Sequence, residues 1–113
     1  MNVFGGYTTI PWGCKDGDQE GEGKSFLFSV RNDNSVVKLE LEAGENVEVF
    51  HRKDCLCNFG GGSDIDVITE CTKHSRNNTN LTRYKAPPRS GAHYLNGGKR
   101  NFKVNELEVF LVI

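Results

Sequence analysis

The chain has 113 residues, which is enough for one hydrophobic core but not for two, so we expect a single domain over residues 1–113. Its 14 lysines and arginines nearly balance 15 aspartates and glutamates, and no basic stripe is interleaved with aromatic residues, so nucleic acid is not expected as a partner. The longest apolar run, Val109–Ile113, is far shorter than the roughly 20 residues that span a bilayer, so we expect a soluble chain without a membrane span.

The first half of the chain carries the patterns of short strands. Residues 13–24 are polar and rich in glycine and are expected to form a loop. Ser25–Val30 is a short apolar run between polar segments, which favours a buried strand. In residues 37–42, apolar and charged side chains alternate, as they do in a sheet with one wet face. Residues 32–35 between these runs have the composition of a hairpin turn.

The middle of the chain predicts two more strands and then a long loop. Val47, Val49 and His51 lie on one side of an alternating segment, and Ile65 and Val67 begin another. The glycine run at residues 60–62 separates the two. Residues 70–100 are rich in Gly, Asn, Ser and Pro, show no helical period and are expected to be a loop.

The C-terminal segment is apolar on both parities. Phe102 and Val104 lie on one side, whereas Leu107, Val109, Leu111 and Ile113 lie on the other. A straight strand would therefore expose half of this apolar set, and a β-bulge near Asn105 and Glu106 would restore one buried face. Together these patterns predict an all-β fold, a two-sheet antiparallel β-sandwich with long loops and little helix.

Four motifs resemble the TLDc domain family, and they occur in that family's order along nearly the whole chain. They are Phe4–Thr8 followed by Ile10–Trp12, then Ser25–Ser29, then Phe59–Ile65 followed by Cys71, and finally Asn101–Val104 continuing through Leu107–Val109. The resemblance is to the C-terminal part of the domain, because the family's N-terminal part is missing ahead of Phe4. The loop at residues 72–83 departs from the family in carrying basic residues.

The resemblance implies a β-sandwich found in eukaryotic proteins that protect against oxidative stress, some of which bind the vacuolar proton-pumping ATPase. No catalytic mechanism is established for the family. We therefore expect a binding module and not an enzyme.

No cofactor is expected, although one acidic segment is a candidate for Ca²⁺. Asp16, Asp18 and Glu20 alternate, and Gly21 stands at the sixth place, as in a loop whose oxygen atoms converge on the ion. The twelfth place, where a bidentate glutamate is needed, holds Leu27. A solvated acidic loop is the simpler interpretation.

Cysteines are a second group of candidates. Cys55, Cys57, Cys71 and His74 supply the atoms of a tetrahedral zinc site, but one residue between the first two is not the usual spacing. Buried free thiols explain them more simply, and disulfides that involve Cys14 or Cys71 are the alternative in a secreted protein. A reactive thiol at Cys55, beside Arg52 and Lys53, is the weakest of these hypotheses.

Two further sets are candidates for a ligand or partner site. In Gly60, Gly61, Gly62, Ser63 and Asp64, successive N–H groups could bind an anion, although tight backbone packing explains the glycines more simply. The other set is the pair of aromatic residues Tyr7 and Trp12. These rings suit either a platform for a sugar or peptide or core packing at the end of the sandwich.

Two functions are carried forward. The first is a cytoplasmic, non-catalytic module that contacts a protein partner. The alternative is a secreted, lectin-like carbohydrate-binding module, assisted by Ca²⁺ on the acidic segment or on Asp64 and Asp66. Sequons at Asn77 and Asn80 favour that alternative. Either function is compatible with an oligomer.

Overall fold

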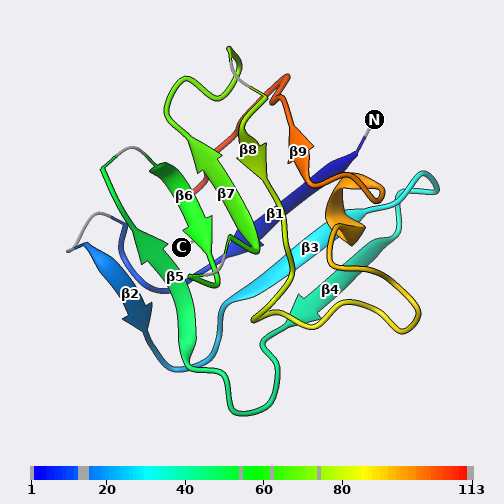
Figure 1. Ribbon diagram of the computed structural model, residues 1–113. Helices are drawn as coiled ribbons and strands as arrows, with labels where there is room; N and C mark the ends of the chain where they lie inside the picture. The colour runs from blue at the N-terminus through cyan, green and yellow to red at the C-terminus, as the bar shows by residue number, and fades with distance from the viewer. Residues whose placement is uncertain (1, 13–15, 54, 62, 74, 112–113) are drawn as a thin grey trace.

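The structure, a computed structural model, describes residues 2–12, 16–53, 55–61, 63–73 and 75–111 (Figure 1). Within these ranges the chain forms nine strands and one short 3₁₀ helix. In chain order they are β1 (Val3–Tyr7), β2 (Gly17–Glu20), β3 (Phe26–Val30), β4 (Val36–Glu40), β5 (Val47–His51), β6 (Cys55–Phe59), β7 (Ile65–Ile68), β8 (Asn77–Asn78), η1 (Tyr94–Asn96) and β9 (Asn101–Phe102).

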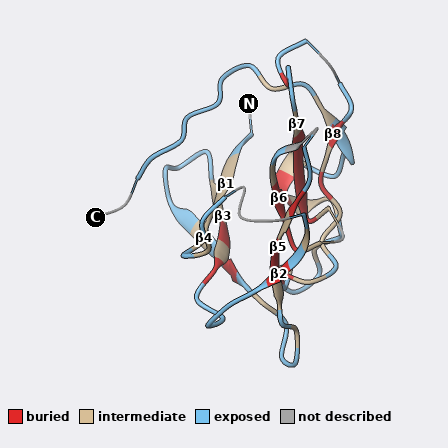
Figure 2. Cartoon of the chain, turned by 90° about the vertical axis from the view of Figure 1, so that its left-hand side faces the viewer, coloured by how far each residue is buried: buried red, intermediate tan, exposed pale blue. Residues whose placement is uncertain are grey.

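Two antiparallel sheets confirm the predicted all-β sandwich. One sheet has the order β1-β3-β4, and the other has the order β2-β5-β6-β7-β8-β9. In Figure 2 the β1, β3 and β4 strands lie in one layer and the β5, β6 and β7 strands in a second layer facing it. Leu27 and Leu39 from the first sheet join Val49, Phe59 and Val67 from the second in one buried cluster. Burial of this cluster between the sheets stabilises the fold.

The hairpin of β3 and β4 follows the sequence prediction closely. Leu27 pairs with Leu39, and both side chains are buried while the alternate residues of β4 face water. The predicted turn closes the hairpin: the Arg31 N–H donates to the Ser35 carbonyl at 2.8 Å, and Asn34 has a φ of 68°. Asparagine tolerates this left-handed conformation better than most residues, which explains why it stands here.

The prediction that residues 13–24 form only a loop was wrong for β2. This strand pairs with β5, with Asp18 opposite Phe50 and Gln19 opposite Val49. Gln19 is its buried residue, and its side-chain amide donates to the Gly17 carbonyl at 3.0 Å. Because β2 contains no apolar residue, hydrophobic periodicity carries no signal for it.

The predicted strands at 47–51 and from residue 65 are confirmed as β5 and β7, and β6 lies between them in the sheet. A register shift between Cys55 and Cys57 interrupts the pairing of β6 with β7. The long segment 70–100 is mostly irregular, as predicted, and its described residues carry the two residues of β8, an isolated bridge of Tyr84 to Leu41 and the single turn of η1.

The predicted C-terminal strand with a bulge at Asn105 and Glu106 was wrong. β9 ends at Phe102, where its pairing with Asn77 of β8 ends, and an alternating apolar pattern forms no strand without a neighbouring strand to pair with. The Val104 N–H still donates to the Cys71 carbonyl at 3.4 Å, after which the described chain to Leu111 forms no strand. In Figure 2 this segment leaves the body of the domain.

No helix in the described ranges has the length and apolar character required to cross a membrane.

Candidate functional site

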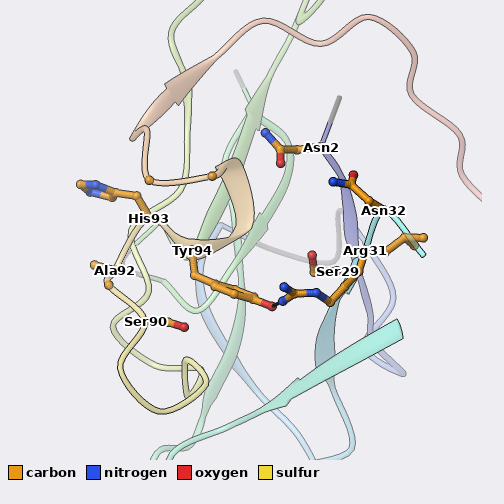
Figure 3. Close-up of a pocket in the computed structure, with 12 residues that line it drawn as sticks. Asn2, Ser29, Arg31, Asn32, Ser90, Ala92, His93 and Tyr94 are labelled. Carbon is orange, nitrogen blue, oxygen red and sulfur yellow. Dashed lines mark hydrogen bonds between the residues drawn. The ribbon is translucent and has the colours of Figure 1, made fainter. Parts of the chain in front are cut away.

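An open groove of about 420 Å³ lies between the end of β3 and the loop that carries η1 (Figure 3). Asn2, Ser29 and Arg31 line one side of it, and His93 and Tyr94 line the other. Across the groove, Nη1 of Arg31 donates to the hydroxyl oxygen of Tyr94 at 2.7 Å. The groove therefore presents polar hydrogen-bonding groups, an aromatic ring and a guanidinium group.

The first wall of the groove is held by the turn after β3. One carboxylate oxygen of Asp33 accepts hydrogen bonds from the Ser35 N–H at 2.9 Å and from the Ser35 hydroxyl at 2.6 Å. The hydroxyl bond is the main cause that lowers the pKa of Asp33, and Arg31 lowers it further. Asp33 is therefore ionised near neutral pH and engaged within its own turn.

The second wall belongs to the long irregular segment, which Asp64 anchors from inside the sandwich. Asp64 is fully buried. One of its carboxylate oxygens accepts the N–H groups of Thr82, Arg83 and Tyr84 at 2.8 to 2.9 Å, and the other accepts the Thr82 hydroxyl at 2.9 Å. Burial raises the pKa of Asp64, and these hydrogen bonds act in the opposite direction. Asp64 thus orders the start of the chain that continues into the groove wall.

Glu48 is a second buried carboxylate, on β5. It accepts the Gly23 N–H at 2.9 Å, the Ser25 N–H at 3.1 Å and the Ser25 hydroxyl at 2.5 Å. Its backbone carbonyl accepts the Tyr84 hydroxyl at 2.8 Å. Glu48 therefore connects the segment before β3 to the same internal network that Asp64 anchors.

The glycine-rich candidates lie next to these carboxylates. Gly60 and Gly61 have φ values of 85° and 66°, in the region where a side chain is strained. The Gly60 N–H donates to the Glu48 carbonyl at 2.9 Å, so this group is engaged within the sheet. The Asp64 side chain packs directly against Gly60. Ser63 is half-buried, and Gly62 lies outside the described residues.

The aromatic candidates Tyr7 and Trp12 have different neighbours. Tyr7 is half-buried and stacks on Phe26 with ring centroids 5.2 Å apart. Trp12 contacts the rings of His51 and Phe59, each with a centroid distance of 5.4 Å, and remains 40% exposed. Both rings thus pack on the body of the domain, and Trp12 keeps a surface open to solvent.

The Ca²⁺ candidates Asp16, Asp18 and Glu20 are exposed in and before β2. Within the described residues, no group of three or more His, Cys, Asp or Glu side chains is placed to hold a metal ion. Asp18 instead lies beside the loop of Gly61, where a β-carbon would meet its Oδ1 at 2.8 Å. Calcium binding by this segment stays a prediction.

Asp64 and Asp66, the second set proposed for Ca²⁺, are both buried and engaged. Asp66 forms an ion pair with Arg52 at 3.2 Å and accepts a hydrogen bond from the Asn78 amide at 3.4 Å.

Cys57 and Cys71 are free thiols. Burial is the main cause that raises the pKa of Cys57 to about 12, so its thiol is protonated at neutral pH. Cys71 is buried in the core cluster. Cys14, His74 and the side chain of Cys55 lie outside what the structure describes, so the zinc and reactive-thiol hypotheses stay predictions.

The asparagine of the first glycosylation sequon, Asn77, has a structural role. Asn77 is fully buried, its amide nitrogen donates to the Cys71 carbonyl at 3.1 Å and the Phe102 carbonyl at 3.0 Å, and its amide oxygen accepts the Ile68 N–H at 3.0 Å. A glycan cannot be attached to this side chain in the folded domain without breaking these bonds. Asn80, in the second sequon, is half-buried.

Sequence reasoning missed the groove and both buried carboxylate networks. Arg31 and Tyr94 are 63 positions apart, and neither stands in a recognisable motif. Glu48 lies on the side of β5 that the alternation assigned to solvent. It is buried there because the segment before β3 covers that side and supplies N–H donors. The one available signal was the position of Arg31 directly before a predicted hairpin turn.

The fold and the groove define an all-β domain with a polar surface site. A family model described as TLDc domain matches residues 1–113, and the chain belongs to this family. The search of curated proteins and the search of solved structures returned no match.

Proposed function

We propose that this TLDc domain is a non-catalytic module that binds a protein partner. The setting implied by the family, protection against oxidative stress or contact with the vacuolar proton-pumping ATPase, is part of the proposal. A cytoplasmic location is also part of it, supported by the free thiols of Cys57 and Cys71 and by the burial of Asn77.

The observation that carries the proposal is the apolar surface of the C-terminal segment. Leu107, Val109, Phe110 and Leu111 are 42%, 80%, 74% and 89% exposed. Four large apolar side chains within five positions differ from the single exposed apolar residues that most surfaces carry. Removing them from water in a complex would favour association by about 25 cal/mol for each Å² of apolar area buried.

The extended form of this segment supports the same function. Residues 103–111 form no strand in the structure, so their backbone can pair with the edge of a partner's sheet. Backbone pairing would supply affinity, and the apolar side chains would supply specificity by filling pockets on the partner.

The test measures binding of the full chain to purified vacuolar proton-pumping ATPase by biolayer interferometry. The triple variant V109S/F110S/L111S is expected to bind at least about tenfold more weakly than the wild type, because it removes the three most exposed apolar side chains of the C-terminal segment. The matched control is Val36→Ser, since Val36 is also an exposed apolar residue, 62% exposed, but lies on β4. It is expected to bind as the wild type does.

A wild-type chain that binds neither this ATPase nor any protein in a cross-linking experiment in cells would contradict the proposal. The alternative function is tested on a glycan array with and without a calcium chelator. Sugar binding that the chelator abolishes would favour the secreted, lectin-like module.

A further inference from the structure

Basic residues are concentrated in the part of the chain that builds the second wall of the groove. Residues 71–105 contain eight lysines and arginines and no aspartate or glutamate, whereas residues 1–70 contain six basic and thirteen acidic residues. The eight are Lys73, Arg76, Arg83, Lys85, Arg89, Lys99, Arg100 and Lys103. Although the whole chain is nearly neutral, residues 1–70 are net acidic and residues 71–105 are net basic.

Among the residues that the structure describes, two of these eight cations pair with acidic side chains. Arg83 pairs with Glu45 at 2.7 Å, and Lys73 pairs with Glu70 at 3.7 Å. The other six are exposed. Their charge is therefore presented to solvent, where it can attract an anionic partner.

Three of the exposed cations stand within two positions of residues that line the groove. Arg89 precedes Ser90 in the chain, and Lys99 and Arg100 follow Gly98. Arg31 is thus the cation that lines the groove itself, and the other three stand in the chain beside the residues of its second wall. Asp33 is the acidic residue nearest to Arg31 in the sequence. Both hydrogen bonds to its Oδ1 come from Ser35, so its carboxylate is engaged within its own turn.

Arg31 is the group best placed to bind an anion. The bond to the Tyr94 hydroxyl uses one of the five N–H donors of the guanidinium group and holds the side chain across the groove (Figure 3). The planar fork of such a group matches the two oxygen atoms of a carboxylate. Asn2, Ser29 and Asn32 line the same groove with side chains that can bond to a peptide backbone.

We propose that this groove binds an acidic peptide segment, a stretch of a protein partner rich in aspartate or glutamate. This inference rests on the proposed function, since it names the chemistry of the partner. Arg31 binds one carboxylate within the groove, and Arg89, Lys99 and Arg100 attract the flanking carboxylates. The C-terminal apolar segment is a separate contact, so the two surfaces can be tested independently.

The probe is a fluorescein-labelled peptide of eight glutamates, and its binding to the full chain is followed by fluorescence anisotropy. Arg31→Gln is expected to weaken binding at least about fivefold, because it removes the charged fork. Arg76→Gln is the matched control, since Arg76 is an exposed arginine of the same basic segment that does not line the groove. It is expected to change affinity by less than about twofold. Raising the salt concentration is expected to weaken binding of the wild type.

Tyr94→Phe is a second variant, which keeps the aromatic ring and removes the hydroxyl that holds Arg31. It is expected to weaken binding about twofold to fivefold, with an unchanged circular dichroism spectrum. Equal losses in Arg31→Gln and Arg76→Gln would overturn the groove as the site, because they would indicate diffuse attraction over the basic segment.

Absence of binding between the wild type and the octaglutamate peptide would also overturn the inference. Tighter binding of a thymidine oligonucleotide, of phosphatidylserine vesicles or of a neutral glycan would overturn the choice of an acidic peptide. If Arg31→Gln binds the vacuolar ATPase normally while V109S/F110S/L111S does not, the inference fails and the proposed function stands. If the wild type binds the peptide but no protein, the proposed function fails.

Discussion

The substitution Asp64→Ala removes the buried acceptor that holds residues 82–84 against the sandwich. Three backbone N–H groups and the Thr82 hydroxyl lose their partner. Leaving a buried donor without an acceptor costs about 1–3 kcal/mol. The Tyr84 N–H is buried and belongs near the upper end of that range, whereas those of Thr82 and Arg83 are partly buried and belong near the lower end.

The expected loss in the free energy of unfolding is about 3–4 kcal/mol, a large share of the 5–15 kcal/mol typical of a domain. Two effects keep the loss from being larger. Water can enter the space that the carboxylate leaves, and the cost of burying the charge, which raises the pKa of Asp64, is removed with it.

Urea unfolding followed by the fluorescence of Trp12 measures this loss, because Trp12 is the single tryptophan and its ring packs on Phe59. Asp33→Ala is the matched control, since Asp33 also accepts two hydrogen bonds but is exposed. Water replaces its bonds, so we expect a much smaller change. A loss below about 1 kcal/mol for Asp64→Ala, with a native circular dichroism spectrum, would refute the role of Asp64 as an anchor.

Three further predictions follow from burial and close packing. Burial raises the pKa of Asp64 in the folded state above its value in the unfolded state. The stability advantage of the wild type over Asp64→Asn should therefore be largest below about pH 4 and fall as the pH rises through the folded pKa. Unfolding of both proteins in urea across this range measures the difference. Gly6→Ala should lose about 1–3 kcal/mol, because the new β-carbon would lie 2.5 to 2.8 Å from the Phe59 ring, and thermal or urea unfolding measures the loss. Cys57, with a pKa raised to about 12, should react with a thiol reagent at pH 8 at least about tenfold more slowly in the native state than in urea, in a variant with no other cysteine.

Each of these predictions has its own check. A wild type that gains stability over Asp64→Asn as the pH rises would show that hydrogen bonding outweighs burial at this carboxylate. Gly91→Ala, where nothing lies within 4 Å of the new β-carbon, should be nearly neutral, and an equal loss in both glycine variants would contradict the steric explanation. Equal reaction rates in the native and unfolded states would contradict the burial of Cys57.

Local patterns predicted the hairpin of β3 and β4 well, because alternation over residues 37–42 reports directly which face of a strand is buried. The same reasoning failed for β2, whose strand depends on backbone pairing with β5 and not on apolar side chains. It failed again beyond Phe102, where the apolar residues to Leu111 are present but pair with no strand in the described part of the chain. Whether an apolar segment joins a sheet depends on a neighbouring strand as well as on its own pattern.

The sequence by itself determined the all-β class, the family, the hairpin and the separation of charge along the chain. Only the tertiary structure decided where that charge lies and what the acidic residues do, because Asp64 and Glu48 meet their donors across 18 to 25 positions and Arg31 meets Tyr94 across 63. Periodicity reports burial along one segment, whereas a groove or a buried carboxylate is formed when distant segments pack together.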